Sequence, residues 1–394
     1  MNRKILILGG VVLILIIIAG IIWIFSGNDG ETPNNNGGFL SGFFPSGGDR
    51  DINGDGSLFP NGDDNPQGYL NNANLFKLSQ SAVSGLSTAT TSIKYIEKST
   101  GHIFEINPDG QNRNRISNTT ILKSFESFWS TDGNSLIVRY LEDSGDYFNI
   151  RNFSGSFSAS TSLEGIFLPN DIKSLVVSPE EKSIFYLIPS GDSNIGLTAS
   201  FLNEKKKQII SIPFGEFNVS WPSKNIISFN TKPSAEIEGH VYFLNLKTGG
   251  FNKIFGDIKG LVSLVSPDAS KILFSQTSGK RIISKIYDID KKTESGFWVN
   301  TIPDKCVWSK KEKGVIYCGT PNSLPNADYP DEWYQGLVSF NDSLWKINID
   351  IGESILVAPD LNMDMINLSL TPDEDYLVFI NKKDNTLFSL KLEE

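Results

Sequence analysis

The densest group of side chains able to contact a ligand lies in one short segment near the C-terminus. Tyr329, Asp331, Glu332, Trp333 and Tyr334 are almost contiguous. Aromatic rings beside carboxylates can stack on sugar rings or anchor a protein partner. The alternative is that Trp333 and Tyr334 only fasten the segment to the rest of the domain. The segment is therefore a candidate binding site for a ligand or partner, with a structural role as its competitor.

Catalytic motifs are sparse elsewhere in the chain. The two histidines, His102 and His240, each lie in an alternating, strand-like segment without a surrounding motif. The sequence contains neither the G-x-S-x-G elbow of a serine hydrolase nor H-x-x-x-H or C-x-x-C metal-ligand spacing. We assign no catalytic residue, metal or other cofactor. Non-enzymatic binding is favoured, and a glycan hydrolase or lyase that uses carboxylates in a central funnel remains the alternative.

A weak calcium motif occurs in the N-terminal part of the chain. Asp51, Asn53 and Asp55 in DINGDG match the first half of an EF-hand loop, which places oxygen ligands at alternate positions. The match fails at the twelfth position, where Gly62 replaces the expected Glu. A polar linker without calcium is the favoured interpretation.

The two cysteines are 12 residues apart, at Cys306 and Cys318, and flank the turn SKKEKG. A turn centred near Glu312 would place them opposite each other on neighbouring strands, close enough for a disulfide. An exported domain would permit that bond. The alternative is a pair of buried thiols.

An unbroken apolar run occupies residues 5–25. A helix of about 20 residues spans the hydrocarbon core of a bilayer, whereas the apolar part of a signal peptide is about 7 to 15 residues long. Arg3 and Lys4 precede the run, and Asp29 and Glu31 follow it. The positive-inside rule therefore predicts a cytoplasmic tail at residues 1–4, one transmembrane anchor and an extracytoplasmic remainder in the plasma membrane.

The segment after the anchor, residues 26–74, is rich in Gly, Asn, Asp, Ser and Pro and has no periodic apolar face. Such composition predicts a flexible linker. The formal net charge of −10 argues against nucleic acid as a partner, because a nucleic-acid binder needs clustered cations. We interpret the lysines at 205–207 as a solvated hairpin turn.

The remainder of the chain contains a repeat in which an apolar stretch is followed by Ser or Thr, a Pro or Asp turn and a second β-rich stretch. The repeat recurs at 42 to 48 residues, with a final interval of 62. Four strands in about 40 to 45 residues are typical of a propeller blade. The markers are Ser130, Ser178, Ser220, Ser266, Ser309 and Thr371.

These repeats predict an all-β, seven-bladed β-propeller over residues 75–394. One blade without the marker is read from residues 92–117, and the strand at 75–80 would complete the last blade and close the ring. An insertion at 319–343 explains the long final interval and carries the aromatic and acidic residues described above. Long loops of distinctive composition are usually functional.

The segments LVSPDASKILFSQ, KIYDID and STDGNSLIVRY resemble the TolB-type, WD-like propeller repeat. YIEKSTGHIFEINPDG resembles membrane-anchored propellers of small-genome, uncultivated bacteria. The TolB resemblance implies a protein-interaction module, although this chain departs from that family in having an anchor and no preceding domain. We therefore expect a scaffold that binds an envelope protein or a cell-wall glycan. A pilus or surface-layer component is a third hypothesis.

Overall fold

The computed structural model describes residues 74–145, 147–157, 163–180, 182–213 and 215–392. The anchor predicted at 5–25, the linker before residue 74 and the calcium candidates Asp51, Asn53 and Asp55 lie outside these residues. Among the helices of the described part, none is both long and apolar enough to cross a membrane.

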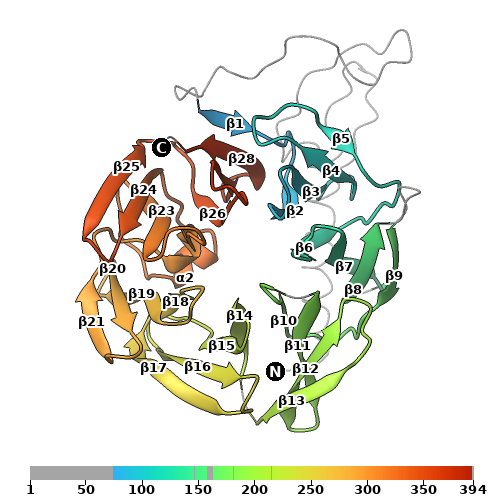
Figure 1. Ribbon diagram of the computed structural model, residues 1–394, viewed down its shortest axis with the longest axis horizontal. Helices are drawn as coiled ribbons and strands as arrows, with labels where there is room; N and C mark the ends of the chain where they lie inside the picture. Colours follow the sequence, from blue (N-terminus) through green and yellow to red (C-terminus); the bar gives the residue numbers. More distant parts are fainter. Residues whose placement is uncertain (1–73, 146, 158–162, 181, 214, 393–394) are drawn as a thin grey trace, which may run out of the picture. The chain divides into compact units, whose positions relative to one another are not determined.

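The described chain forms seven four-stranded antiparallel sheets arranged around an axis, which confirms the predicted seven-bladed propeller (Figure 1). The first blade is β2 to β5, and the next five blades follow in order to β25. The seventh blade contains β26, β27, β28 and β1. Its order from the axis outward is β26, β27, β28, β1.

The strands of each blade run in sequence from the axis to the rim. The innermost strands are β2 (Val83–Ser87), β6 (Ser124–Trp129), β10 (Ser174–Val177), β14 (Phe217–Ser223), β18 (Val262–Val265), β22 (Cys306–Trp308) and β26 (Met365–Leu370). The second strands are β3 (Ile93–Glu97), β7 (Ser135–Asp143), β11 (Ser183–Ser190), β15 (Ile226–Thr231), β19 (Lys271–Ser278), β23 (Val315–Pro321) and β27 (Tyr376–Asn381). The third strands are β4 (Ile103–Ile106), β8 (Phe148–Phe157), β12 (Ser193–Ser200), β16 (Glu238–Asn245), β20 (Arg281–Asp288), β24 (Asp342–Asn348) and β28 (Thr386–Lys391). The outermost strands are β5 (Asn114–Arg115), β9 (Leu163–Phe167), β13 (Lys207–Ile212), β17 (Phe251–Lys259), β21 (Thr293–Gly296), β25 (Glu353–Ala358) and β1 (Leu75–Lys77).

The second strands are the most apolar because each lies between two neighbouring blades. Along β27, for example, every residue from Leu377 to Asn381 is buried. The apolar clusters bridge adjacent blades. One of them joins Ile93 and Tyr95 of the first blade to Val378 and Leu387 of the seventh. Burial on both faces explains why these strands are continuous apolar runs instead of alternating patterns.

The ring closes through β1, which pairs antiparallel with β28. The strand expected at residues 75–80 is shorter in the structure, at Leu75–Lys77, and Leu75 lies opposite Leu390. The pairing extends one residue further, since the amide of Lys391 donates a 2.8 Å hydrogen bond to the carbonyl of Asn74. The two ends of the described chain therefore meet in one blade.

The recurring Ser and Asp residues form the turn between the first and second strands. In the fifth blade the Ser266 hydroxyl donates to Asp268 (2.7 Å), and the backbone amide of Lys271 donates to Ser266 Oγ (3.0 Å). The second blade repeats the arrangement with Ser130 and Asp132 (2.6 Å). Its Gly133 takes a φ of 66°, a left-handed conformation that glycine adopts without strain. Local hydrogen bonding therefore explains the sequence marker.

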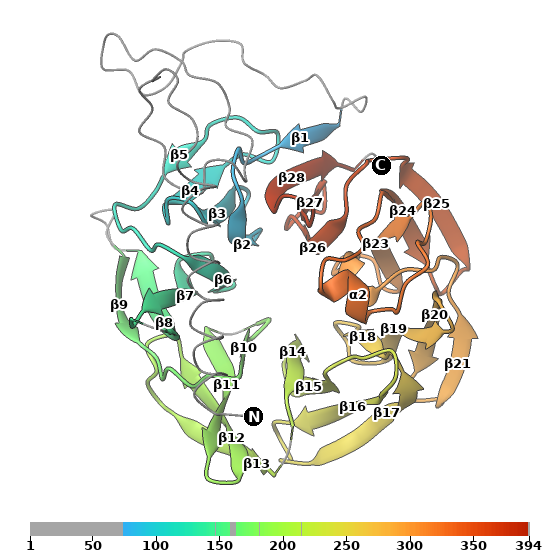
Figure 2. The same cartoon turned by 180° about the vertical axis from the view of Figure 1, so that it is seen from behind.

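These turns define two faces of the propeller. We call the face that carries the turns between first and second strands the turn face. The opposite face, where second strands lead into third strands, carries the loop at 322–341 and is called the insertion face. Both views of the ring show this loop, with its short helix α2 (Asp331–Tyr334), near the axis (Figures 1 and 2).

Cys306 and Cys318 lie directly opposite each other on β22 and β23. Their sulfurs are bonded, and the two Cα atoms are 4.1 Å apart. Both residues are buried in the cluster that joins the fifth and sixth blades. The disulfide therefore links the two strands nearest the axis in the sixth blade.

Truncation of one side chain in β1, the closing strand, tests ring closure. We expect Leu75→Ala to lower the free energy of unfolding by about 3 kcal/mol, because Leu75 is 5% exposed and packs on the seventh blade. Urea denaturation measures this loss. The same substitution at Leu337, which is 69% exposed, is the matched control and should change stability by less than about 0.5 kcal/mol. Equal effects of the two substitutions would contradict closure through β1.

The disulfide predicts that titration of the folded, unreduced domain detects no free thiol. We expect the double substitution Cys306→Ala and Cys318→Ala to lower the free energy of unfolding by about 3 kcal/mol, because a short covalent loop restricts the unfolded chain. Denaturation of the unreduced parent and the double variant measures the difference. Two titratable thiols in the folded parent would contradict the bond.

Candidate functional site

The insertion that carries the sequence-predicted binding residues connects β23 to β24. Tyr329 and Trp333 are 1% and 2% exposed, so both rings face the interior of the domain. Together with Phe340 they form a cluster that extends to Val262 of the fifth blade. The buried position of Trp333 agrees with the structural alternative, in which this residue fastens the insertion to the rest of the domain.

The remaining members of the predicted group differ in their surroundings. The Asp331 carboxylate accepts a 2.6 Å hydrogen bond from the amide of Ala235 in the fourth blade. Glu332 accepts one from the Asp328 amide (3.2 Å). Tyr334, by contrast, is 39% exposed. Of the five residues, Tyr334 is therefore the one whose ring is most open to a ligand.

Beneath the insertion lies a buried charged triad, formed by Lys305, Asp342 and Asp364, each fully buried. Lys305 belongs to the short helix η2 (Pro303–Lys305) before β22, Asp342 begins β24, and Asp364 precedes β26. Lys305 Nζ lies 2.7 Å from Asp342 Oδ2 and also contacts Asp364 Oδ1. The triad joins the sixth and seventh blades.

Hydrogen bonds from the insertion complete the triad. Trp333 Nε1 and the Phe340 amide donate to Asp364 Oδ2 at 3.0 and 3.1 Å. The Met365 amide donates to Asp342 Oδ2 at 2.7 Å. Burial raises the pKa of Asp342 to about 6, although the Lys305 ammonium and the Met365 amide act in the opposite direction. The insertion therefore satisfies buried charge and does not merely cover apolar surface.

A small pocket opens beside the insertion, lined by the inner strands of the fifth, sixth and seventh blades. Its volume is about 310 Å³, and its polar groups are Asp304, Tyr334, Asn367 and Lys382. Tyr334 donates a 2.7 Å hydrogen bond to Asp304 Oδ2, and Lys382 Nζ donates to the carbonyl of Trp333 at 2.7 Å. We call it the insertion-face pocket.

The protein environment perturbs three groups of the insertion-face pocket. Asp304 is solvent-accessible, yet the atoms packed around it raise its pKa, against the effects of Tyr334 and Lys305. Although the ring of Tyr334 is partly exposed, the protein atoms packed around its hydroxyl, followed by the proximity of Asp304, raise its pKa, so the phenol stays protonated at neutral pH. Burial lowers the pKa of Lys382. Perturbed groups in a recess are typical of functional sites, although structural networks also produce them.

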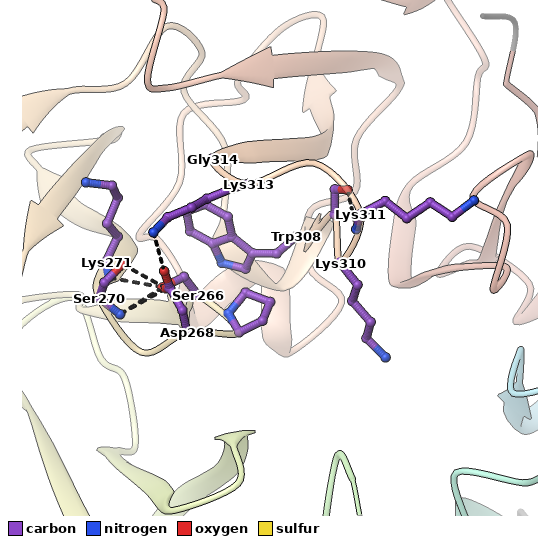
Figure 3. A pocket seen from close by; sticks show the side chains of 11 residues that line it. Ser266, Asp268, Ser270, Lys271, Trp308, Lys310, Lys311, Lys313 and Gly314 are labelled. Atoms are coloured by element: carbon purple, nitrogen blue, oxygen red, sulfur yellow. Dashed lines mark hydrogen bonds and ion pairs between the residues drawn. The ribbon is translucent and has the colours of Figure 1, made fainter.

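A second pocket, of about 260 Å³, lies on the turn face between the fifth and sixth blades (Figure 3). We call it the Trp308 recess. Trp308 forms part of its wall, and four lysines surround it. They are Lys271, Lys310, Lys311 and Lys313. Figure 3 shows Lys313 directed at Asp268, with which it forms a 3.2 Å ion pair.

The charges of the Trp308 recess are unevenly paired. Lys271 lies 3.1 Å from Asp288, whereas Lys310 forms no ion pair with any described residue. Burial would raise the pKa of Asp268, but hydrogen bonds from Ser266 and Ser270 and the nearby Lys313 hold it well below its ordinary value. Lys311 lies 3.8 Å from Asp373, so three of the four lysines are paired with carboxylates and Lys310 is the cation without an ion pair among the described residues.

A comparable recess lies on the turn face between the third and fourth blades. We call it the Trp221 recess, since Trp221 lines it together with four lysines. Lys182 pairs with Asp132, and Lys224 lies 3.6 Å from Glu180. Lys205 and Lys207 make no ion pair within the described chain. The lysine run interpreted as a solvated turn therefore contributes two cations to a pocket wall. The lysines are Lys182, Lys205, Lys207 and Lys224.

A further pocket, which we call the channel mouth, lies near the axis on the same face and is lined by apolar side chains and by six residues with hydroxyl groups. Its volume is about 510 Å³, and it includes Lys310, which also lines the Trp308 recess. Glu374 is engaged by the Ser309 hydroxyl (2.6 Å) and the Lys310 amide (2.7 Å). The hydroxyls are those of Ser87, Thr88, Ser130, Thr131, Ser369 and Thr371. The channel mouth therefore presents hydroxyl groups beside one lysine and the carboxylate of Glu374.

The histidines lie away from these pockets. His240 Nδ1 accepts a 3.3 Å hydrogen bond from the amide of Asp257 on β17, and the His102 ring lies near Phe104. Loss of solvation, followed by the nearby charge of Arg115, lowers the pKa of His102. In the described ranges, no three His, Cys, Asp or Glu side chains are grouped as metal ligands would be.

Comparison with known proteins gives a fold relationship. No family model and no curated protein matches the sequence. Among solved structures, the chain is similar to an oligogalacturonate lyase in complex with manganese, at a TM-score of 0.53 and 12% identity over 81% of this chain and 89% of the other. It is also similar to an oligogalacturonate lyase from Vibrio parahaemolyticus, at a TM-score of 0.55 and 9% identity over 81% of this chain and 94% of the other. These identities establish the fold alone.

The buried position of Trp333 predicts a loss of stability upon truncation. We expect Trp333→Ala to lower the free energy of unfolding by about 3 to 5 kcal/mol, because it opens a cavity and removes a donor from Asp364. Thermal and urea denaturation measure the loss. Tyr334→Ala is the control within α2 and should cost clearly less. An unchanged melting temperature for Trp333→Ala would contradict the structural role.

Proposed function

We propose that the domain is a non-enzymatic binding module that recognises an acidic glycan across its turn face. The observation that carries this proposal is the pair of lysine-lined recesses, each with a tryptophan, on a chain whose formal net charge is −10. Cations gathered in pockets of an acidic protein attract anionic ligands and orient them. An extended polymer can contact both recesses, whereas a small anion can occupy only one.

The chemistry of the turn face favours a carbohydrate over other polyanions. Sugars present hydroxyls as well as charge, and the channel mouth beside Lys310 offers hydroxyls from three blades. The net negative charge opposes nucleic acid, whose dense phosphates require many neutralising cations. A glycan whose carboxylates or phosphates alternate with hydroxyl groups fits a few lysines separated by neutral hydroxyl groups.

We further propose that the module acts at the cell envelope. The apolar run at 5–25 would anchor the chain in the plasma membrane, and the linker would hold the propeller outside the cytoplasm. In this position a cell-wall glycan is an accessible ligand. The disulfide agrees with an oxidising compartment.

A second candidate function is a glycan lyase or hydrolase that uses the insertion-face pocket. The observation that favours it is the contact between Asp304 and Tyr334 beside Lys382. A carboxyl group with a raised pKa can act as a general base near neutral pH, and a protonated phenol can supply a proton to a leaving oxygen. The named lyases of the same fold make this chemistry worth testing.

One experiment distinguishes the two candidates, with oligogalacturonate as the probe and the full chain in detergent. Calorimetry should detect binding that weakens with added salt, because the contacts are ionic. Ultraviolet absorbance should detect no unsaturated product. Absence of binding at low salt would contradict the proposal for this ligand class. Product formation that Asp304→Asn abolishes would establish the second candidate instead.

Lysine substitutions locate the binding surface. We expect Lys310→Ala combined with Lys313→Ala to weaken oligogalacturonate binding by about tenfold, equivalent to about 1.4 kcal/mol. The matched control removes the same charge from the outermost strand of the fourth blade, through Lys253→Ala and Lys259→Ala. Calorimetry on both variants measures the difference. Equal weakening would show a general charge effect and contradict a site in the Trp308 recess.

A further inference from the structure

The buried triad combines an amine and a carboxyl group in direct contact, in surroundings that exclude water. Lys305 Nζ contacts Asp364 Oδ1, and both side chains are fully buried. The rings of Trp333 and Phe340 lie 5.5 and 5.2 Å from the same nitrogen. Because the two groups are in contact, a proton can pass directly from Nζ to Oδ1. The product of that transfer is a neutral amine beside a neutral carboxylic acid.

Hydrogen bonds hold the carboxyl group of Asp364 in an arrangement that suits nucleophilic attack on its Cγ. Trp333 Nε1 donates to Oδ2 at 3.0 Å and also lies 3.3 Å from Oδ1, the Phe340 amide donates to Oδ2, and Oδ1 faces the amine. Two fixed donors on one oxygen polarise the C–O bond and stabilise the negative charge that develops there when a nucleophile adds to Cγ. The arrangement separates an oxygen that is retained from an oxygen that can leave.

A second carboxylate, that of Asp342, also contacts the amine. Asp342 Oδ2 lies 2.7 Å from Lys305 Nζ, and Asp342 Oδ1 is buried without a hydrogen-bond partner among the described residues. An unpartnered buried oxygen is rare in folded proteins and calls for an explanation. A proton can reside on Oδ1 without breaking any contact. The raised pKa of Asp342 agrees with a group that gives and takes protons near neutral pH.

We propose that Lys305 and Asp364 condense to an intramolecular isopeptide bond, with Asp342 as the proton carrier. Neutral Nζ attacks Cγ of the protonated Asp364, and a C–N bond forms. Asp342 takes a proton from the nitrogen and delivers a proton to Oδ1 of Asp364. This oxygen leaves as water when its bond to Cγ of Asp364 breaks. Oδ2 becomes the amide oxygen. One water molecule is released, no group is oxidised or reduced, and Asp342 is regenerated.

The bond would join the sixth blade to the seventh, across 59 residues of sequence that include the disulfide. It would also replace a buried ion pair by a neutral amide, which removes the cost of keeping two charges away from water. The reaction requires the folded insertion, since Trp333 and Phe340 supply the donors and exclude the solvent. The cross-link is therefore a covalent consequence of correct folding.

Intact mass spectrometry of the full chain, purified folded and then reduced, tests the proposal. We expect a mass below that of the linear sequence by one water molecule. A proteolytic digest should contain a branched peptide that joins Lys305 to Asp364. On reducing denaturing gels the chain should migrate faster than an uncross-linked variant. A full linear mass, together with an unbranched peptide that contains Lys305, would overturn the proposal.

Substitutions identify the role of Asp342. Asp342→Asn keeps the size of the side chain but removes the proton carrier, so it should fold and retain the linear mass. Asp328→Asn is the matched control, because Asp328 pairs with Lys280 at the surface of the same insertion, and this variant should still lose water. Loss of water in folded Asp342→Asn would overturn the assigned carrier. If Asp342→Asn does not fold, the digest of the parent chain decides whether the bond forms.

Discussion

The structure depends on the pairing of β1 with β28. A propeller blade buries its faces only against neighbours, so an open ring would expose two apolar faces at the break. Here the first described strand completes the blade formed by the last three, and Leu75 packs into their apolar cluster. The first and seventh blades then share Ile93, Val378 and Leu387 in one cluster. Closure converts seven repeated units, none of which buries its faces alone, into one cooperative domain.

The insertion shows how the ring accommodates an irregular element. Trp333 and Phe340 do not lie on the surface as a platform; they cover Lys305 and two carboxylates at the boundary between the sixth and seventh blades. Breaking such a triad by removal of one member is costly, because it leaves an unpaired buried charge. Because Trp333 and Phe340 must stay on the triad, they restrict the conformations of the insertion. The buried charges thus fix the structure of the insertion face, whereas the lysine-lined recesses of the turn face are accessible pockets.

The blades could be predicted from the sequence because the signal is local. Ser266 and Asp268 close their turn through hydrogen bonds within a few residues, and such turns recur at a regular interval. The pairing of the two strands that carry Cys306 and Cys318 could be predicted for the same reason. The buried triad could not, since its members come from three distant segments and meet only after the insertion folds. Lys310 and Lys313 were visible in SKKEKG, where Glu312 interrupts the lysines, but their recess requires the neighbouring blade. The inward orientation of Tyr329 and Trp333 had no local signal.

The meeting of the chain ends in the seventh blade has a topological consequence. Because the amide of Lys391 bonds to Asn74, the described backbone forms almost a closed circle. A circle has no preferred starting point, so the order of the blades around the axis does not depend on which blade is synthesised first. Circular permutation of the propeller, with residues 74 and 392 joined and new ends opened in an exposed turn, should preserve the same blades. Both ends also leave from one place, so the whole propeller can be inserted into a loop of another protein without separating the two sides of that loop.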